Sequence, residues 1–103
     1  MTIPATMSVR TAVGSASGLH ARPASLFVQA AARQPVPVRI ARPGEAPVDA
    51  RSLLSVMSLA AKHGEELELS VADTADDAQA RTVLDELAAL LQQDLDAAGQ
   101  ATR

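Results

Sequence analysis

The chain contains no cysteine and almost no aromatic residues. The lack of cysteine excludes disulfides and every metal site built on thiolates. Phe27 is the sole aromatic ring apart from the two histidines, so the side chains that stack on nucleobases are missing. The net charge is −3 and the pI about 5.2, so a basic footprint for nucleic acid is also missing. These absences argue against binding of DNA or RNA.

Long apolar runs are absent as well. None approaches the roughly 18 consecutive apolar residues that a membrane-spanning helix needs, so we expect no membrane insertion. Residues 1–8 do not place a basic segment before an apolar one, which argues against a secretory signal. By elimination we expect a cytoplasmic protein.

Length and composition favour one globular domain. The chain has 103 residues, of which 48% are hydrophobic and 20% charged. With so few aromatics, the core must be built from aliphatic side chains and alanine. We expect a single domain over 1–103, with its core at about 7–95 and a polar tail at 96–103.

Hydrophobic periodicity predicts seven elements. Alternating patterns indicate strands at 7–13, 36–40, 47–50 and 66–71, and Pro37 suggests that the second strand lies at a sheet edge. Helical spacing indicates helices at 21–33 and 52–61 and a third that starts at Thr74, with Asp77 completing a capping box, and stops near Gly99.

The order strand, helix, strand, strand, helix, strand, helix indicates an α+β fold. We expect strands two and three to form a hairpin within one four-stranded antiparallel sheet. The three helices would cover one face of that sheet, giving two layers. The pairing order of the strands is not visible in the periodicity.

His20 stands where a loop of small residues ends and a helix begins. The amides of Ala21 and Arg22 would point toward it, and the helix dipole places partial positive charge there, which suits an anion. Arg22 adds a guanidinium that can hold two phosphate oxygens at once. The same positive surroundings favour the neutral imidazole, which keeps a nucleophilic lone pair. The chemistry suits a carrier of phosphoryl groups.

A plainer interpretation is equally open from these residues alone. His20 would then be a helix N-cap, and Arg22 a solvated surface charge.

The run Gly-Leu-His-Ala-Arg-Pro-Ala at 18–24 resembles the active-site signature of the HPr family. These are the histidine-containing phosphocarriers of the bacterial phosphoenolpyruvate:sugar phosphotransferase system. The segment Ser-Leu-Leu-Ser-Val-Met-Ser-Leu at 52–59 resembles that family's regulatory-serine helix, at matching spacing. The resemblance extends from about residue 7 to 95.

The resemblance implies an open-faced β-sandwich and a set of roles. His20 would accept phosphate on Nδ1 from phosphorylated Enzyme I and deliver it to sugar-specific IIA domains. Arg22 would neutralise the phosphate, with Ser17 a nearby loop hydroxyl and Ala21 contributing to the phosphate site. We accordingly expect a monomeric phosphocarrier rather than an enzyme, with no cofactor and no metal.

The helix at 52–61 is too apolar for its length. Leu53, Leu54 and Met57 form rows that a single buried face cannot hold, and Leu26 has a similar problem in the first helix. They are either part of a small core or an exposed patch that docks partner proteins, and the resemblance favours docking.

Ser52 matches the position that a dedicated kinase phosphorylates in many members of the family. The alternative is a helix N-cap and nothing more. Arg51 and Ser55 depart from the regulated pattern, so this site stays open. His63 lies in a polar turn and is interpreted as solvated, and the acids at 73, 76 and 77 are interpreted as complements of a helix dipole rather than metal ligands.

Two other functions remain as alternatives. One is a regulatory adaptor controlled through Ser52, and the other is a phosphatase with His20 as nucleophile, for which no general acid is evident. Nothing in the residues selects the sugar system or the acceptor.

Overall fold

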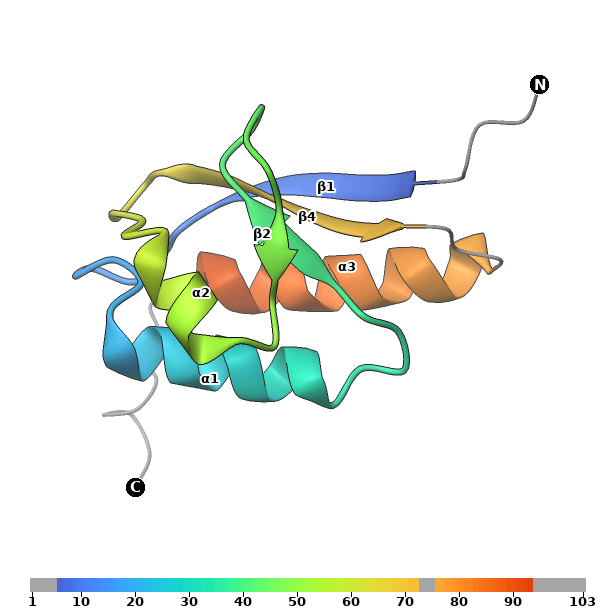
Figure 1. The fold of residues 1–103 in the computed structure, drawn as a ribbon, viewed down its shortest axis with the longest axis horizontal. Helices are drawn as coiled ribbons and strands as arrows, with labels where there is room; N and C mark the ends of the chain where they lie inside the picture. The colour runs from blue at the N-terminus through green and yellow to red at the C-terminus, as the bar shows by residue number, and fades with distance from the viewer. Residues whose placement is uncertain (1–5, 73–75, 94–103) are drawn as a thin grey trace.

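All seven predicted elements are present in the computed structural model, which describes residues 6–72 and 76–93 (Figure 1). In chain order they are β1 (Thr6–Ala12), α1 (Ala21–Ala32), β2 (Arg39–Ala41), β3 (Val48–Asp49), α2 (Leu53–Ser58), β4 (Glu66–Ala72) and α3 (Asp77–Gln92). The order inferred from periodicity is therefore confirmed.

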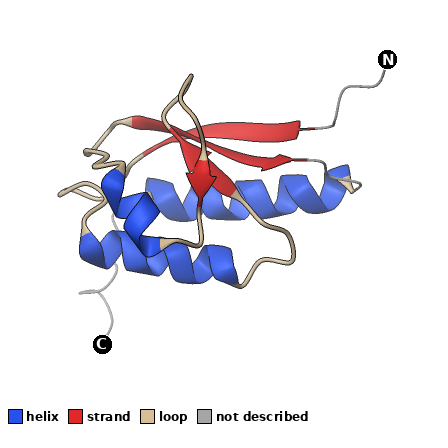
Figure 2. Cartoon of the chain, viewed as in Figure 1, coloured by secondary structure: helices blue, strands red, loops and turns tan. Residues whose placement is uncertain are grey.

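The four strands form one antiparallel sheet in the order β1-β4-β2-β3. Val9 of β1 and Ile40 of β2 both lie opposite Leu69 of β4, and Ile40 also pairs with Val48 of the predicted hairpin. The strands form one layer and the helices lie beneath it (Figure 2). The predicted open-faced α+β sandwich is confirmed.

The alternating pattern of β4 fixes which face of the sheet is covered. Leu67, Leu69 and Val71 are buried, while the two side chains between them are half-buried. Because successive side chains of a strand point to opposite faces, the apolar set meets the helices. The apolar stripe of α3 and the ring of Phe27 from α1 complete the core against it.

The prediction of an edge position for the second strand is wrong. β2 begins at Arg39, after Pro37, and lies between β4 and β3. The proline therefore removes no ladder hydrogen bond, because it precedes the strand. The Ala50 amide still donates to the Val38 carbonyl at 3.0 Å, so pairing reaches slightly beyond the strand itself.

The predicted ends of the third helix also need correction. α3 begins at Asp77, and the carboxylate of Asp76 caps it by accepting the Gln79 amide at 3.0 Å. The predicted cap, Thr74, lies outside the described residues. The helix ends at Gln92 rather than near Gly99, because Gln93 takes an extended backbone. No helix in the described part of the chain is long and apolar enough to cross a membrane.

Candidate functional site

The loop before α1 delivers His20 to the start of the helix. His20 is the N-cap residue with extended backbone (φ −86°, ψ −166°), and its carbonyl accepts the Ala24 amide at 2.9 Å. His20 therefore occupies the N-cap position that the plain interpretation gives it, but its exposed side chain makes no capping hydrogen bond. The first-turn amides and the positive end of the helix dipole therefore lie beside an exposed imidazole.

Gly18 allows this loop to lie directly against the chain at 61–62. Its φ is +80°, and a Cβ placed there would come within 2.5 Å of the Ala61 carbonyl oxygen and 3.2 Å of the Lys62 Cα. The next amide, that of Leu19, donates to the same Ala61 carbonyl at 2.8 Å. Only glycine fits such a backbone approach, so the loop is fixed two residues before His20.

A hollow of about 310 Å³ opens at this contact. It is lined by Ser17, Leu19, His20, Met57, Ala60, Ala61 and Lys62. Three residues singled out from the sequence, Ser17, His20 and Met57, are thus brought together. Lys62 was missed, because no local pattern relates it to a histidine 42 residues earlier.

Two larger hollows lie elsewhere on the molecule. One of about 460 Å³ borders the β2–β3 hairpin, and one of about 420 Å³ lies between the C-terminal ends of α1 and α3. Neither includes a residue of the loop before α1. The smaller hollow is the candidate site because it alone of the three contains the histidine.

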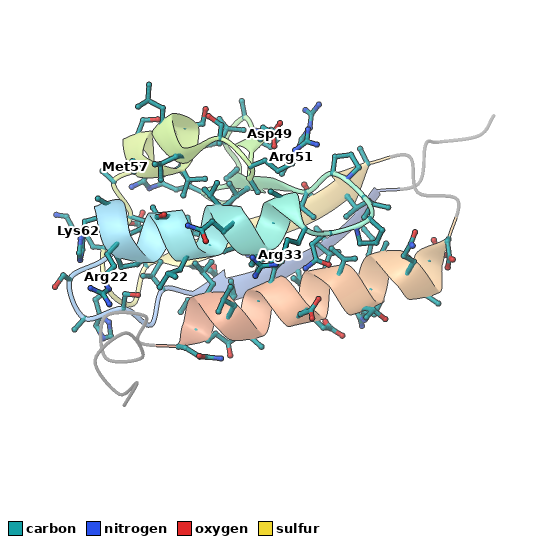
Figure 3. The ribbon with its side chains drawn as sticks, turned by 90° about the horizontal axis from the view of Figure 1, so that it is seen from below. Arg22, Arg33, Asp49, Arg51, Met57 and Lys62 are labelled. Atoms are coloured by element: carbon teal, nitrogen blue, oxygen red, sulfur yellow. The ribbon has the colours of Figure 1, made fainter. Side chains whose placement is uncertain are left out.

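Ala21 and Arg22 occupy the first turn of α1 on the exposed surface and do not line the hollow. Arg22 lies at the same end of the molecule as Lys62 and Met57 (Figure 3). Within residues 6–72 and 76–93 Arg22 makes no ion pair. Its guanidinium is therefore not neutralised by a carboxylate of the described part of the chain.

The apolar side chains singled out from the sequence are exposed. Leu54 is 80% exposed, Leu53 40%, Leu26 37% and Met57 36%. The interpretation of these four as surface residues is confirmed. Val56 of the same short helix is fully buried and anchors α2 to the core.

Ser52 is the N-cap of α2. Its hydroxyl oxygen accepts the Ser55 amide at 3.2 Å, which is the structural role considered from the sequence. The side chain is half-buried and immediately precedes Leu53. Ser52 therefore lies at the border of the exposed apolar side chains of α2.

Three contacts hold the turn at 62–65 in place. The Glu65 carboxylate forms an ion pair with the Arg42 guanidinium and accepts the Lys62 amide at 3.0 Å. The hydrogen bond from Arg42 is the largest cause that holds the pKa of Glu65 below its usual range. His63 is exposed, yet its Nδ1 lies 3.3 Å from the Ser15 carbonyl oxygen. The interpretation of His63 as purely solvated is therefore incomplete.

A small carrier that holds a phosphoryl group on histidine needs an accessible ring nitrogen and anion ligands on an open surface. The exposed His20 at a helix start, beside a shallow hollow and with cations at the same end of the molecule, fits that class of protein.

Comparison with known proteins gives the family. Residues 7–93 match the model described as the PTS HPr component phosphorylation site. The phosphocarrier protein HPr of Streptomyces coelicolor is 48% identical over 88 residues, which are 84% of this chain and 89% of that protein. The crystal structure of a phosphocarrier protein HPr from Bacillus anthracis has a TM-score of 0.73 at 36% identity, covering 85% and 99% of the two chains. The chain belongs to the HPr family of phosphocarriers of the phosphotransferase system.

A further relative bears on the oligomeric state. The HPr-like protein Crh of Bacillus subtilis is 40% identical over 79 residues, 77% of this chain and 87% of that protein. A Crh crystal structure, with a TM-score of 0.60 and 39% identity over 80% and 88% of the chains, is described as an intertwined dimer with a swapped domain. The monomeric state expected from the sequence therefore stays a prediction.

Proposed function

We propose that this chain accepts a phosphoryl group on Nδ1 of His20 from phosphorylated Enzyme I and passes it to IIA domains for carbohydrate uptake. The observation that carries the proposal is the exposed His20 side chain at the start of α1, where the first-turn amides and Arg22 supply ligands for an anion. In each transfer a nitrogen–phosphorus bond forms as the donor's bond to phosphorus breaks, so no cofactor is needed.

The site favours a carrier over an enzyme. The hollow beside His20 is open, and none of its seven lining residues carries a carboxylate. A phosphatase would need a group to activate water or protonate the leaving group, and these residues offer no carboxylic acid for that role. A phosphoryl group on His20 would be held by amides and cations yet stay reachable for an acceptor protein.

Leu53, Leu54 and Met57 form the proposed docking patch. These side chains are exposed on α2, and Met57 also lines the hollow that contains His20. Burying apolar side chains of this surface under a partner lowers the free energy of the complex, and methionine adapts its shape to different partners.

The replacement Met57→Glu tests the docking patch. A buried carboxylate in the interface would cost desolvation energy, so transfer from Enzyme I should slow at least tenfold while the fold is kept. Ala32→Glu, at an exposed position near the end of α1, is the matched control for the added charge. Equal transfer rates for the two variants would contradict the docking role.

A regulatory adaptor controlled at Ser52 is the second candidate. The Ser52 hydroxyl lies at the first turn of α2, directly before Leu53 of the docking patch. A phosphate added by a serine kinase would be tolerated at the helix start yet place negative charge beside the patch. Ser52→Asp should then weaken binding of Enzyme I, whereas Ser52→Ala should leave it unchanged.

The chain is proposed to work as a single-domain cytoplasmic monomer. Reconstitution tests the carrier function: label from phosphoenolpyruvate should reach the chain only with Enzyme I present and leave it when a IIA domain is added. Steady release of inorganic phosphate without an acceptor would indicate a phosphatase instead.

A further inference from the structure

Lys62 shares a hollow with His20 but comes from a different part of the fold. It is exposed, and it follows Ala61, whose carbonyl accepts the Leu19 amide. In the described ranges 6–72 and 76–93 its ammonium makes no ion pair. No carboxylate of these ranges therefore contacts and neutralises the Lys62 charge at the site.

The acid of the same turn is engaged elsewhere. The Glu65 carboxylate binds the Arg42 guanidinium and also accepts the backbone amide of Lys62. The hydrogen bond from Arg42 is the largest cause that lowers the pKa of Glu65, and the backbone hydrogen bond from Lys62 comes next, whereas the coulombic effect of the Lys62 charge is the smallest of the causes. Because Arg42 already satisfies Glu65, the Lys62 ammonium is left to serve another anion.

The backbone of Lys62 is fixed relative to the loop that carries His20. A Cβ placed on Gly18 would lie only 3.2 Å from the Lys62 Cα, so the two backbones are in direct contact. The contact from His63 Nδ1 to the Ser15 carbonyl oxygen, at 3.3 Å, ties the same turn to the same loop. A lysine side chain starting from this fixed point has a flexible four-carbon stem with which to reach an anion in the hollow.

We propose that Lys62 is a second phosphate-binding cation that contacts the phosphoryl group on His20. Arg22 would approach that group from α1, and Lys62 from the turn between α2 and β4, at the same end of the molecule (Figure 3). The inference rests on the proposed function, because it assigns a ligand to the phosphoryl group that His20 would carry. Two cations from separate elements hold the group in one orientation more firmly than one.

The titration of the phosphoryl group measures this contact. A positive charge about 5 Å from a phosphate oxygen in water lowers its pKa by about 0.6 unit at low ionic strength. Chemical phosphorylation with phosphoramidate needs no Enzyme I, so it separates the inference from the proposed function. The ³¹P resonance of phosphorylated His20 is assigned by its loss in His20→Ala, and its pH midpoint is then measured in each variant.

Three variants test the contact through the shift of the ³¹P titration midpoint. Lys62→Gln should raise the ³¹P midpoint by about 0.5 unit, and Lys62→Arg should restore it to within about 0.2 unit of the wild type. Arg33→Gln removes an equal charge from the exposed end of α1, outside the hollow, and should shift the midpoint by less than about 0.1 unit at physiological salt.

An unchanged midpoint in Lys62→Gln would overturn the proposal. An equal shift in Arg33→Gln would overturn it too, because net charge would then explain the effect. A wild type that titrates as expected yet takes no phosphate from Enzyme I would refute the proposed function and leave the Lys62 contact standing.

Discussion

Ala60 has a left-handed backbone, and replacing it by glycine should stabilise the protein. Its φ is +50°, whereas the other described residues with positive φ are glycines. It follows the C-cap Leu59 of α2, and its amide donates to the Met57 carbonyl at 3.0 Å, so the turn conformation is fixed. The left-handed conformation costs a non-glycine residue about 1–2 kcal/mol. Glycine removes that cost but gains about 0.4–1 kcal/mol of entropy in the unfolded chain.

The net expectation for Ala60→Gly is a stabilisation of about 0.5–1 kcal/mol, or about 2–6 °C in Tm for a domain of this size. Urea and thermal unfolding followed by far-UV circular dichroism measure it, because the chain has no tryptophan for fluorescence. Gly44→Ala is the mirror control: φ is +85° and no atom lies within 4 Å of a Cβ there, so only the backbone cost remains. If Gly44→Ala destabilises and Ala60→Gly does not stabilise, the reasoning from φ is refuted.

Three other outcomes follow from packing and charge. Gly14→Ala would place a Cβ 1.7 Å from the Gln92 carbonyl oxygen and should cost about 3 kcal/mol or more in unfolding free energy. Leu84→Ala removes a fully buried side chain and should cost about 2–5 kcal/mol in the same urea assay. The pKa of Glu65 is lowered from its ordinary 4.5, chiefly by the hydrogen bond from Arg42. The ionised Glu65 therefore stabilises the folded protein above pH 4.5, and this stabilisation is lost as the pH falls through the pKa of Glu65 in the folded state. Glu65→Gln should therefore lose less stability than the wild type between pH 6 and pH 3.

The element order was predictable because the periodicity of each segment reports burial directly. The apolar alternation of β4 has the burial that its spacing implies. For the surplus leucines of α2 the spacing left burial and exposure open, and the structure shows them exposed. The edge position assigned to β2 failed for a physical reason. Pro37 restricts only the residue it occupies and its neighbour, and the strand begins two residues later.

The position of His20 was readable from the sequence because a glycine loop, a histidine and a helix start lie within a few residues. The residues that lie near His20 but come from distant parts of the sequence could not be predicted in this way. Lys62 reaches the loop through a backbone approach to Gly18, and His63 through its ring nitrogen; both contacts depend on how distant segments of the chain pair, which periodicity does not reveal. Gly18 was the one available signal, since a glycine with positive φ beside a site often marks a close backbone approach.

The most direct test of the central claim is the site of phosphorylation. The chain has two histidines, so His20→Ala and His63→Ala are matched variants for intact-mass measurement after incubation with phosphoenolpyruvate and Enzyme I. The expected result is an acid-labile gain of one phosphoryl group in the wild type and in His63→Ala, with none in His20→Ala. A full gain in His20→Ala, or no gain in the wild type with Enzyme I shown active on a control carrier, would contradict the account.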